Sequence, residues 1–264
     1  MTAAFFLRRF TMKKIIVRAD DLGFTEGVNY GIEKTCRDGI IHSVGIMTNM
    51  PATKHGYDLV KDLPLCFGLH TNICAGKPLS DPKLIPSICD EKGNLKSSKT
   101  YRASFKEGID FVDLDEVIIE IEAQYEAFVK LTGDKPHYFE GHAVASENFF
   151  KGLQIVAERH GCDYLGMNFN GPTKFRNSYL YNAMDSMNPD YDPFESLKKY
   201  ALKDYGENGY LMFVCHPGYL DQPILDISSM TLPRPKEVAM CIAQETKDWL
   251  VKNDIQVITY DDLP

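Results

Sequence analysis

The sequence predicts a single-domain α/β fold in which about seven parallel strands are covered by helices. Short apolar runs rich in β-branched residues alternate with longer helix-like segments along most of the 264 residues. Such alternation is typical of a parallel sheet with helical crossovers. No linker rich in Pro, Gly, Ser or charge divides the chain, and this length fits one large domain.

The expected elements follow from apolar pattern alone. The strand-like runs cover residues 15–19, 43–48, 65–69, 138–139, 164–169, 211–215 and 256–260. The helix-like segments cover residues 27–36, 54–61, 115–130, 147–159, 193–205 and 236–252. The helix over 115–130 has the strongest pattern, because Val117, Ile121, Tyr125 and Phe128 recur at roughly helical spacing.

The sheet could be open and doubly wound, or closed as a barrel. The glycine signature that binds dinucleotide phosphates is missing after the first expected strand, which favours the barrel. Residues 74–112 contain no clear barrel element. An insertion of this length is typical of an active-site loop or lid.

Composition excludes several classes of partner. The formal net charge of -8 argues against nucleic-acid and membrane-surface binding, since both need a basic face. No stretch approaches the ~20 apolar residues of a membrane span. The seven cysteines are scattered and odd in number, so a disulfide framework is not expected and a reducing cytoplasm is the simplest location.

The first eleven residues are interpreted as a non-native or disordered extension, and residues 12–264 as the barrel domain. An apolar run over residues 3–7 precedes two arginines, whereas a secretory signal places its charges before a longer apolar stretch. Met12 and two lysines directly precede the first expected strand. Translation starting at Met12 would give the same domain.

Acids and histidines stand at the ends of four expected strands. Asp20 and Asp21 end the first strand and His70 the third; His142 closely follows the fourth, and His216 ends the sixth. Because the carboxyl ends of parallel strands share one rim, these side chains are expected to converge in one cleft. Buried in an apolar barrel, such groups are costly unless they are paired or bind a metal.

Each of these residues also has an ordinary structural interpretation. Asp21 could cap the following helix, and His70 could be a hydrogen-bonded core histidine. His142 could be a solvated loop residue, and His216 could mark the turn before Pro217. The combination is more specific than its members, because four independent coincidences would be needed to produce it.

Two histidines and one carboxylate form a ligand set that leaves positions open for water and substrate. A divalent cation held in this way lowers the pKa of water and polarises a carbonyl oxygen. A second carboxylate beside the ion can accept the proton of that water, and adjacent aspartates could divide these two roles. The set suffices for hydrolysis of an amide or an ester.

Four motifs follow one another along the chain: Arg18-Ala19-Asp20-Asp21-Leu22-Gly23, Gly68-Leu69-His70, Gly141-His142 and Cys215-His216-Pro217-Gly218. Their order and spacing resemble those of the YdjC-like carbohydrate deacetylases. The similarity extends from Lys13 to the C-terminus and includes Arg234 and Glu237 at the start of a helix.

This resemblance implies a distorted (β/α) barrel of seven strands that uses a divalent metal to remove N-acetyl groups. The implied substrates are chitooligosaccharides such as diacetylchitobiose. The implied metal ligands are Asp21, His70 and His142. Asp20 would be the general base, and His216 an acid or a stabiliser of the transition state.

Further expectations concern substrate, metal and assembly. Asn72 and Arg176 are assigned to substrate binding. The resemblance to YdjC-like deacetylases suggests Mg²⁺ as the metal, and the imidazole ligands make Zn²⁺ the alternative. Exposed apolar residues on the helices suggest a homodimer. Many relatives have several alternating histidines where this chain has Ala143-Val144-Ala145 after His142, a difference that could alter contacts around the ligands or substrate preference.

Two alternatives stay open at this point. A metal-dependent phosphoesterase would need more metal ligands and a positive charge for phosphate, for which Lys174 and Arg176 are the available candidates. A sensor of sugar or metal would keep the ligands without turnover. The intact Asp20 argues against the sensor, because binding alone needs no spare base.

Overall fold

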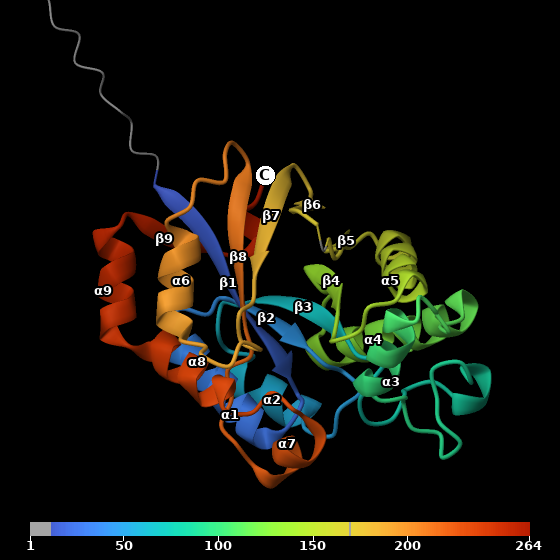
Figure 1. The fold of residues 1–264 in the computed structure, drawn as a ribbon. Helices are drawn as coiled ribbons and strands as arrows, with labels where there is room; N and C mark the ends of the chain where they lie inside the picture. Colours follow the sequence, from blue (N-terminus) through green and yellow to red (C-terminus); the bar gives the residue numbers. More distant parts are fainter. Residues whose placement is uncertain (1–11, 169) are drawn as a thin grey trace, which may run out of the picture.

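The structure is a computed structural model that describes residues 12–168 and 170–264. The expected extension over residues 1–11, and Phe169 at the end of the fifth expected strand, lie outside the described residues. The described part forms one α/β domain whose helices surround a strongly curved sheet (Figure 1).

Within residues 12–168 and 170–264, nine strands form the sheet, in the order β5-β4-β3-β2-β1-β8-β7-β6, with β9 added beside β1. All pairings are parallel except the β6–β7 hairpin. The expected parallel α/β barrel is therefore confirmed as a nearly closed barrel, with seven of its strands where the sequence predicted them. The strands are β1 (Lys13–Leu22), β2 (Ser43–Ile46), β3 (Cys66–Thr71), β4 (Tyr138–Gly141), β5 (Asp163–Tyr164), β6 (Thr173–Phe175), β7 (Ser178–Ala183), β8 (Gly209–Cys215) and β9 (Ile255–Ile258).

The helices connect successive strands over the outer face of the sheet (Figure 1). The single helix expected over 236–252 is two helices, because Ala243 has an extended backbone with ψ 134°. The α-helices are α1 (Glu26–Arg37), α2 (Thr53–Val60), α3 (Ser98–Lys106), α4 (Leu114–Thr132), α5 (Glu147–Arg159), α6 (Pro193–Ala201), α7 (Gln222–Ile227), α8 (Pro233–Ile242) and α9 (Gln244–Lys252), and short 3₁₀ turns are η1 (Pro82–Leu84) and η2 (Tyr260–Asp262).

The first strand is the centre of the sheet. One edge of β1 pairs with β8 from Ile15 to Ala19. The first half of β1 pairs with β9, and its second half, from Arg18 to Leu22, pairs with β2. Three segments distant in sequence therefore fix the position of β1, which near its end carries Asp20, the expected base, and Asp21, an expected metal ligand.

The buried apolar side chains form two clusters, one between the sheet and the helices and one inside the barrel. The larger cluster joins the sheet to the helices and includes Val17 and Ala19 of β1. The smaller cluster contains no α-helical residue and includes Ile16 of β1 together with Tyr138 and Tyr260. Because side chains alternate across a strand, the inward set of β1 continues from Ile16 through Arg18 to Asp20.

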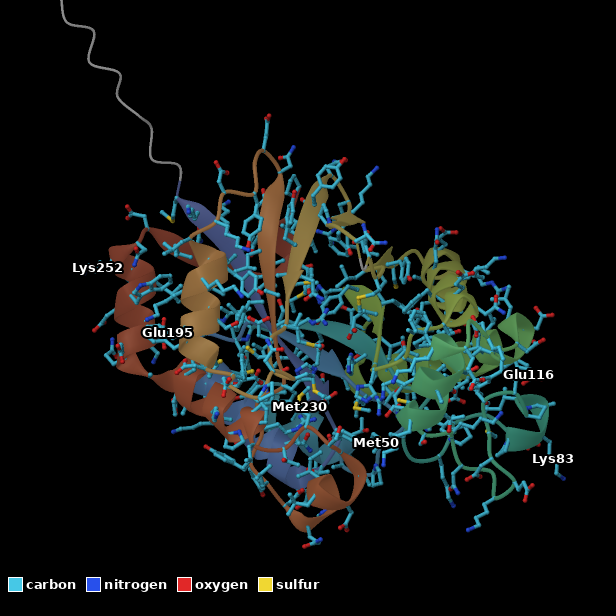
Figure 2. The ribbon with its side chains drawn as sticks, viewed as in Figure 1. Met50, Lys83, Glu116, Glu195, Met230 and Lys252 are labelled. Atoms are coloured by element: carbon cyan, nitrogen blue, oxygen red, sulfur yellow. The ribbon has the colours of Figure 1, made fainter. Side chains whose placement is uncertain are left out.

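The insertion over residues 74–112 contains α3 and η1 and packs against α4. The backbone N–H of Ser87 donates to Glu116 at 2.6 Å, and that of Ser80 donates to Glu120 at 3.0 Å. Figure 2 labels Lys83 and Glu116 at the same outer edge of the molecule. The hydroxyl of Tyr101 donates to the Ile73 carbonyl at 2.8 Å, so the insertion is anchored beside the carboxyl end of β3.

Candidate active site

The chain reverses sharply where β1 ends. Asp21 has φ 76° and Gly23 φ 102°, conformations that L side chains rarely adopt. A side chain at Gly23 would place its Cβ 2.8 Å from the Met47 carbonyl. The helix that follows is capped by Thr25, whose side chain accepts from the Val28 N–H, so Asp21 is not its cap.

The turn brings Asp21 to two histidines. Its Oδ1 lies 3.1 Å from His70 Nε2 and 3.1 Å from His142 Nδ1. The two ring nitrogens are 2.9 Å apart, and all three side chains are largely buried. One carboxylate oxygen and two imidazole nitrogens thus converge on one point, in a group that could hold a metal ion. The structure brings these three predicted ligands together.

Electrostatics around Asp21 are dominated by a buried arginine. Arg234 Nη2 lies 2.7 Å from Asp21 Oδ2, and both side chains are almost fully buried. Burial alone would raise the pKa of Asp21, but Arg234 and His142 hold that pKa well below its usual range. Burial lowers the pKa of His142, and the Asp21 charge reverses this and raises the pKa to about 9. A cation at this point would displace that proton.

Glu140 contacts the other side of His70 and was missed by the sequence analysis. Its Oε1 is hydrogen-bonded to His70 Nδ1, so Nε2 is the nitrogen that faces Asp21. The sequence could have indicated Glu140, because it lies two residues before His142 at the end of a strand. Side chains two residues apart in a strand point to the same face of the sheet. Gly45 allows this approach, since a Cβ there would lie 3.0 Å from the His70 Cβ and 3.1 Å from Glu140 Oε1.

Asp20 points into the barrel beside this group. Its Oδ2 accepts from Arg18 Nη2 at 2.7 Å, while its Oδ1 is buried without a hydrogen-bond partner among the described residues. Burying an oxygen in this way is costly. Asp20 is therefore a buried carboxylate with one oxygen anchored by Arg18 and one oxygen without a hydrogen-bond partner among the described residues.

His216 follows β8 at the same rim. Its backbone N–H donates to Glu237, and its Nδ1 is buried without a hydrogen-bond partner among the described residues. Burial lowers the pKa of His216 to about 4, against the opposing charges of Asp21 and Asp20. The imidazole is therefore neutral at neutral pH.

The side chains of the two expected substrate-binding residues are both engaged by other parts of the protein. The Asn72 side chain is fully buried and donates to Asn49 at 3.0 Å and to the Ala75 carbonyl at 2.8 Å. Arg176 lies in the turn before β7, at the amino end of that strand. It pairs with Asp163 at 2.7 Å and donates to the Tyr260 carbonyl. Both side chains bind the protein itself.

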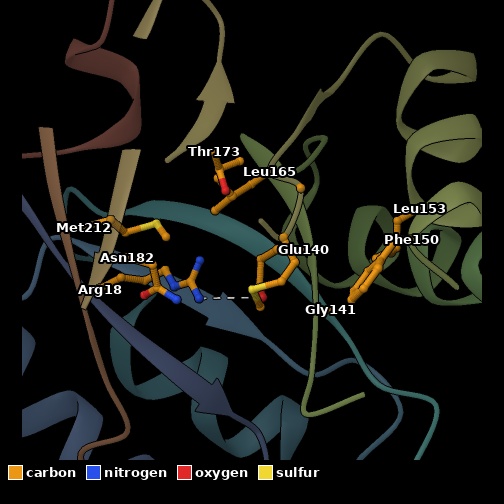
Figure 3. Close-up of a pocket in the computed structure, with 11 residues that line it drawn as sticks. Arg18, Glu140, Gly141, Phe150, Leu153, Leu165, Thr173, Asn182 and Met212 are labelled. Carbon is orange, nitrogen blue, oxygen red and sulfur yellow. Dashed lines mark ion pairs between the residues drawn. The ribbon is translucent and has the colours of Figure 1, made fainter. Parts of the chain in front are cut away.

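A small cavity lies inside the barrel next to Arg18 and Glu140. Figure 3 shows Met212 and Asn182 on one side of it, and Leu165 with Thr173 above. Its volume is about 30 Å³, and a water needs about 10–15 Å³ on this scale. The cavity therefore has room for water molecules but not for a larger molecule.

Comparison with known proteins identifies the family. The YdjC-like protein family model matches residues 14–252. The chain belongs to the YdjC-like family. This YdjC-like chain is 29% identical to Carbohydrate deacetylase 2 of Listeria innocua, covering 95% of the chain and 99% of that relative. It is also 29% identical to a carbohydrate deacetylase of Clostridium beijerinckii, covering 95% of the chain and 100% of that relative.

Solved structures share the fold of this YdjC-like chain. An Enterococcus faecalis V583 protein, provisionally assigned to cellobiose-phosphate cleavage, superposes with a TM-score of 0.79 at 21% identity over 96% of the chain and 99% of that protein. A peptidoglycan N-acetylglucosamine deacetylase superposes with a TM-score of 0.54 at 10% identity over 96% and 88%. These likenesses establish the architecture.

The family and enzyme class that the motifs predicted are thus confirmed. This YdjC-like chain is a hydrolase of the carbohydrate deacetylase family. Among its described helices, none is long and apolar enough to cross a membrane. The homodimer and the cytoplasmic location stay predictions.

Proposed function

We propose that this chain removes N-acetyl groups from short N-acetylated carbohydrates, with chitooligosaccharides such as diacetylchitobiose as the leading candidates. The observation that carries the proposal is the convergence of Asp21, His70 and His142 within 3.1 Å of one another. A deacetylase needs such a group beside a carboxylate that can accept a proton, and Asp20 is that carboxylate.

The ligand atoms fit one divalent ion. With the Nδ1–H group of His70 donating a hydrogen bond to Glu140, the lone pair of Nε2 is free to bind an ion, as in the carboxylate–histidine pairs of metal sites. Asp21 and His142 offer the other two ligands. When bound, such an ion would lower the pKa of water and polarise the carbonyl of the acetyl group. Mg²⁺ is the ion suggested by family resemblance, and two imidazoles favour Zn²⁺.

Asp20 is the proposed general base. Arg18 holds Oδ2 at 2.7 Å, and this leaves Oδ1 to accept the proton of the attacking water. The water oxygen forms a bond to the acetyl carbon, and the bond from that carbon to the sugar nitrogen then breaks. The departing amine needs one proton, and Asp20 can return the proton that it accepted.

His216 is proposed to stabilise the transition state by hydrogen bonding. A pKa near 4 means that the imidazole has no proton to spare at neutral pH, so the role of donor to the developing oxyanion is favoured over that of general acid. We expect His216→Asn to lower kcat without removing a pH limb near neutrality. Loss of such a limb would assign the acid role to His216.

The deciding experiment measures acetate release from a panel of N-acetylated mono- and oligosaccharides. The protein is assayed as purified, after chelation, and after addition of Mg²⁺ or Zn²⁺. We expect release that chelation abolishes and one ion restores. Phosphate release from sugar phosphates without acetate release would instead identify a phosphoesterase. Binding of the sugars without either product would identify a sensor.

A further inference from the structure

A second group of metal-ligand atoms lies at the opposite end of the barrel. Cys66, His137 and Asp261 place a sulfur, a ring nitrogen and a carboxylate oxygen within 4.8 Å of one another. Cys66 opens β3, His137 immediately precedes β4, and Asp261 lies in η2 near the C-terminus. Figure 1 shows the C-terminus at the end of the sheet where β1 begins, away from the rim that holds the catalytic group.

The backbone holds each of these residues in place. The His137 N–H donates to the Phe67 carbonyl at 2.9 Å, which aligns it with Cys66 one residue earlier in β3. Thr259 and Asp262 close a capping box around η2. Within this frame His137 Nδ1 lies 2.8 Å from Asp261 Oδ2. Three segments that are remote in sequence therefore present one ligand each.

We propose that Cys66, His137 and Asp261 form a second metal site that binds a thiophilic divalent cation, with Zn²⁺ the best match. A thiolate, an imidazole and a carboxylate form a common ligand set for this ion. Metal–ligand distances of about 2.0–2.3 Å place tetrahedral ligand atoms about 3.5 Å apart. His137 Nδ1 and Asp261 Oδ2, now 2.8 Å apart, have to separate slightly, and the ligand atoms already lie within 4.8 Å of one another, so small movements of the two exposed side chains suffice.

Burial and charge suit an ion that enters from solvent. Cys66 is 2% exposed, whereas the His137 and Asp261 side chains are 37% and 44% exposed. Water can therefore complete the coordination. Burial and the nearby Asp261 raise the pKa of the Cys66 thiol, and a dication reverses this effect, so binding releases the thiol proton to solvent.

An ordinary surface ion pair between His137 and Asp261 is the competing explanation. Arg176 Nη2 is 3.9 Å from Asp261 Oδ1, but the same guanidinium is engaged more closely by Asp163 at 2.7 Å. The thiol distinguishes the two explanations, because an ion pair has no use for Cys66. Binding would fasten the C-terminal segment to the start of β3 and β4, a role independent of deacetylation.

The experiment titrates the full chain with Co²⁺, which takes zinc sites and gives a near-ultraviolet charge-transfer band when a thiolate is a ligand. We expect the band in the wild-type protein, its loss in Cys66→Ser and its weakening in His137→Gln and Asp261→Asn. Cys74→Ser is the matched control, because this thiol lies 3.9 Å from the His142 carbonyl beside the catalytic group. Far-ultraviolet circular dichroism checks that each variant folds.

A second measurement removes the catalytic ligands. In His70→Ala/His142→Ala, Zn²⁺ at a hundredfold excess over Kd is expected to raise Tm by about 5 °C or more, and adding Cys66→Ser removes the rise. Absence of the Co²⁺ band in the wild-type protein, or a band that survives Cys66→Ser and disappears in Cys74→Ser, overturns the proposal. Neither result affects the test of acetate release.

Discussion

The interior of the barrel differs between its two ends in the side chains that fill it. At the carboxyl end, Asp21, His70 and His142 form a buried polar group, and Asp20 Oδ1 and His216 Nδ1 beside it have no hydrogen-bond partner among the described residues. At the amino end, Tyr260 packs on Tyr138 with ring centroids 4.2 Å apart. The two ends therefore differ in what they contribute. Aromatic packing at the amino end stabilises the barrel, whereas the carboxyl end holds buried polar groups together at a cost in stability, as active sites do.

Arg18 marks the boundary between these regions. Its Nη1 donates to the Tyr260 hydroxyl at 3.2 Å, and its Nη2 pairs with Asp20 at 2.7 Å. Arg18 also lies 3.7 Å from Glu140. One buried cation thus offsets two buried carboxylates, which allows the carboxyl end to hold its negative charge close to the apolar packing.

The largest loss of activity is expected when the proposed metal ligand Asp21 is replaced. Asp21→Asn removes the charge proposed to hold a cation between two imidazoles, and it leaves Arg234 without its ion-pair partner. Metal content by mass spectrometry and acetate release should both fall to background at micromolar metal. Millimolar metal should restore part of the activity. Full activity with unchanged metal content would remove Asp21 from the ligand set.

Asp20→Asn should fail in a different way. The amide keeps the shape but cannot accept a proton, so kcat is expected to drop by about 100-fold or more, with KM little changed. Bound metal should be close to the wild-type amount. If this variant loses the metal while Asp21→Asn keeps it, the two aspartates have exchanged roles.

Glu140→Gln tests the residue behind His70. The amide is a weaker acceptor for the Nδ1 proton, so the His70 ring loses its fixed orientation, and metal affinity is expected to fall by about tenfold or more. Competition with a fluorescent chelator measures that affinity. Activity at saturating metal should recover most of its wild-type value, whereas a catalytic role for Glu140 would leave kcat low.

The smallest effect is expected at the amino end. Phe175 is 1% exposed and packs edge-on against Tyr260, with ring centroids 5.5 Å apart. Phe175→Leu should cost about 1 kcal/mol of unfolding free energy and lower Tm by about 2–4 °C. Acetate release at 25 °C should be unchanged. A fall in kcat at unchanged stability would show that the two ends are coupled.

Much of the fold could be predicted because buried parallel strands are continuous apolar runs. The hairpin of β6 and β7 escaped prediction, since residues of β7 alternate between buried and exposed positions and include polar side chains. The break at Ala243 was also missed, because the apolar pattern continues across it. The spacing of apolar residues does not show that a single residue changes the direction of the backbone.

The convergence of Asp21, His70 and His142 could be predicted because parallel strand ends share a rim. Arg234 was noted only as a family feature, because its pairing with Asp21 spans 213 residues. Asn72 and Arg176 were assigned to substrate, yet their polar atoms bind Asn49 and Asp163. Which polar group finds a protein partner depends on packing that one sequence does not show.

The central place of β1 has a consequence for biosynthesis. Among the described strands β1 is made before the others, and it pairs with β8 and β9, which end at Cys215 and Ile258. Its edges therefore stay without these partners until almost the whole chain has been made. Contacts that span so much sequence also slow folding. Until β8 and β9 have been made, the apolar β1 keeps unpaired edges, a feature that favours aggregation of the nascent chain.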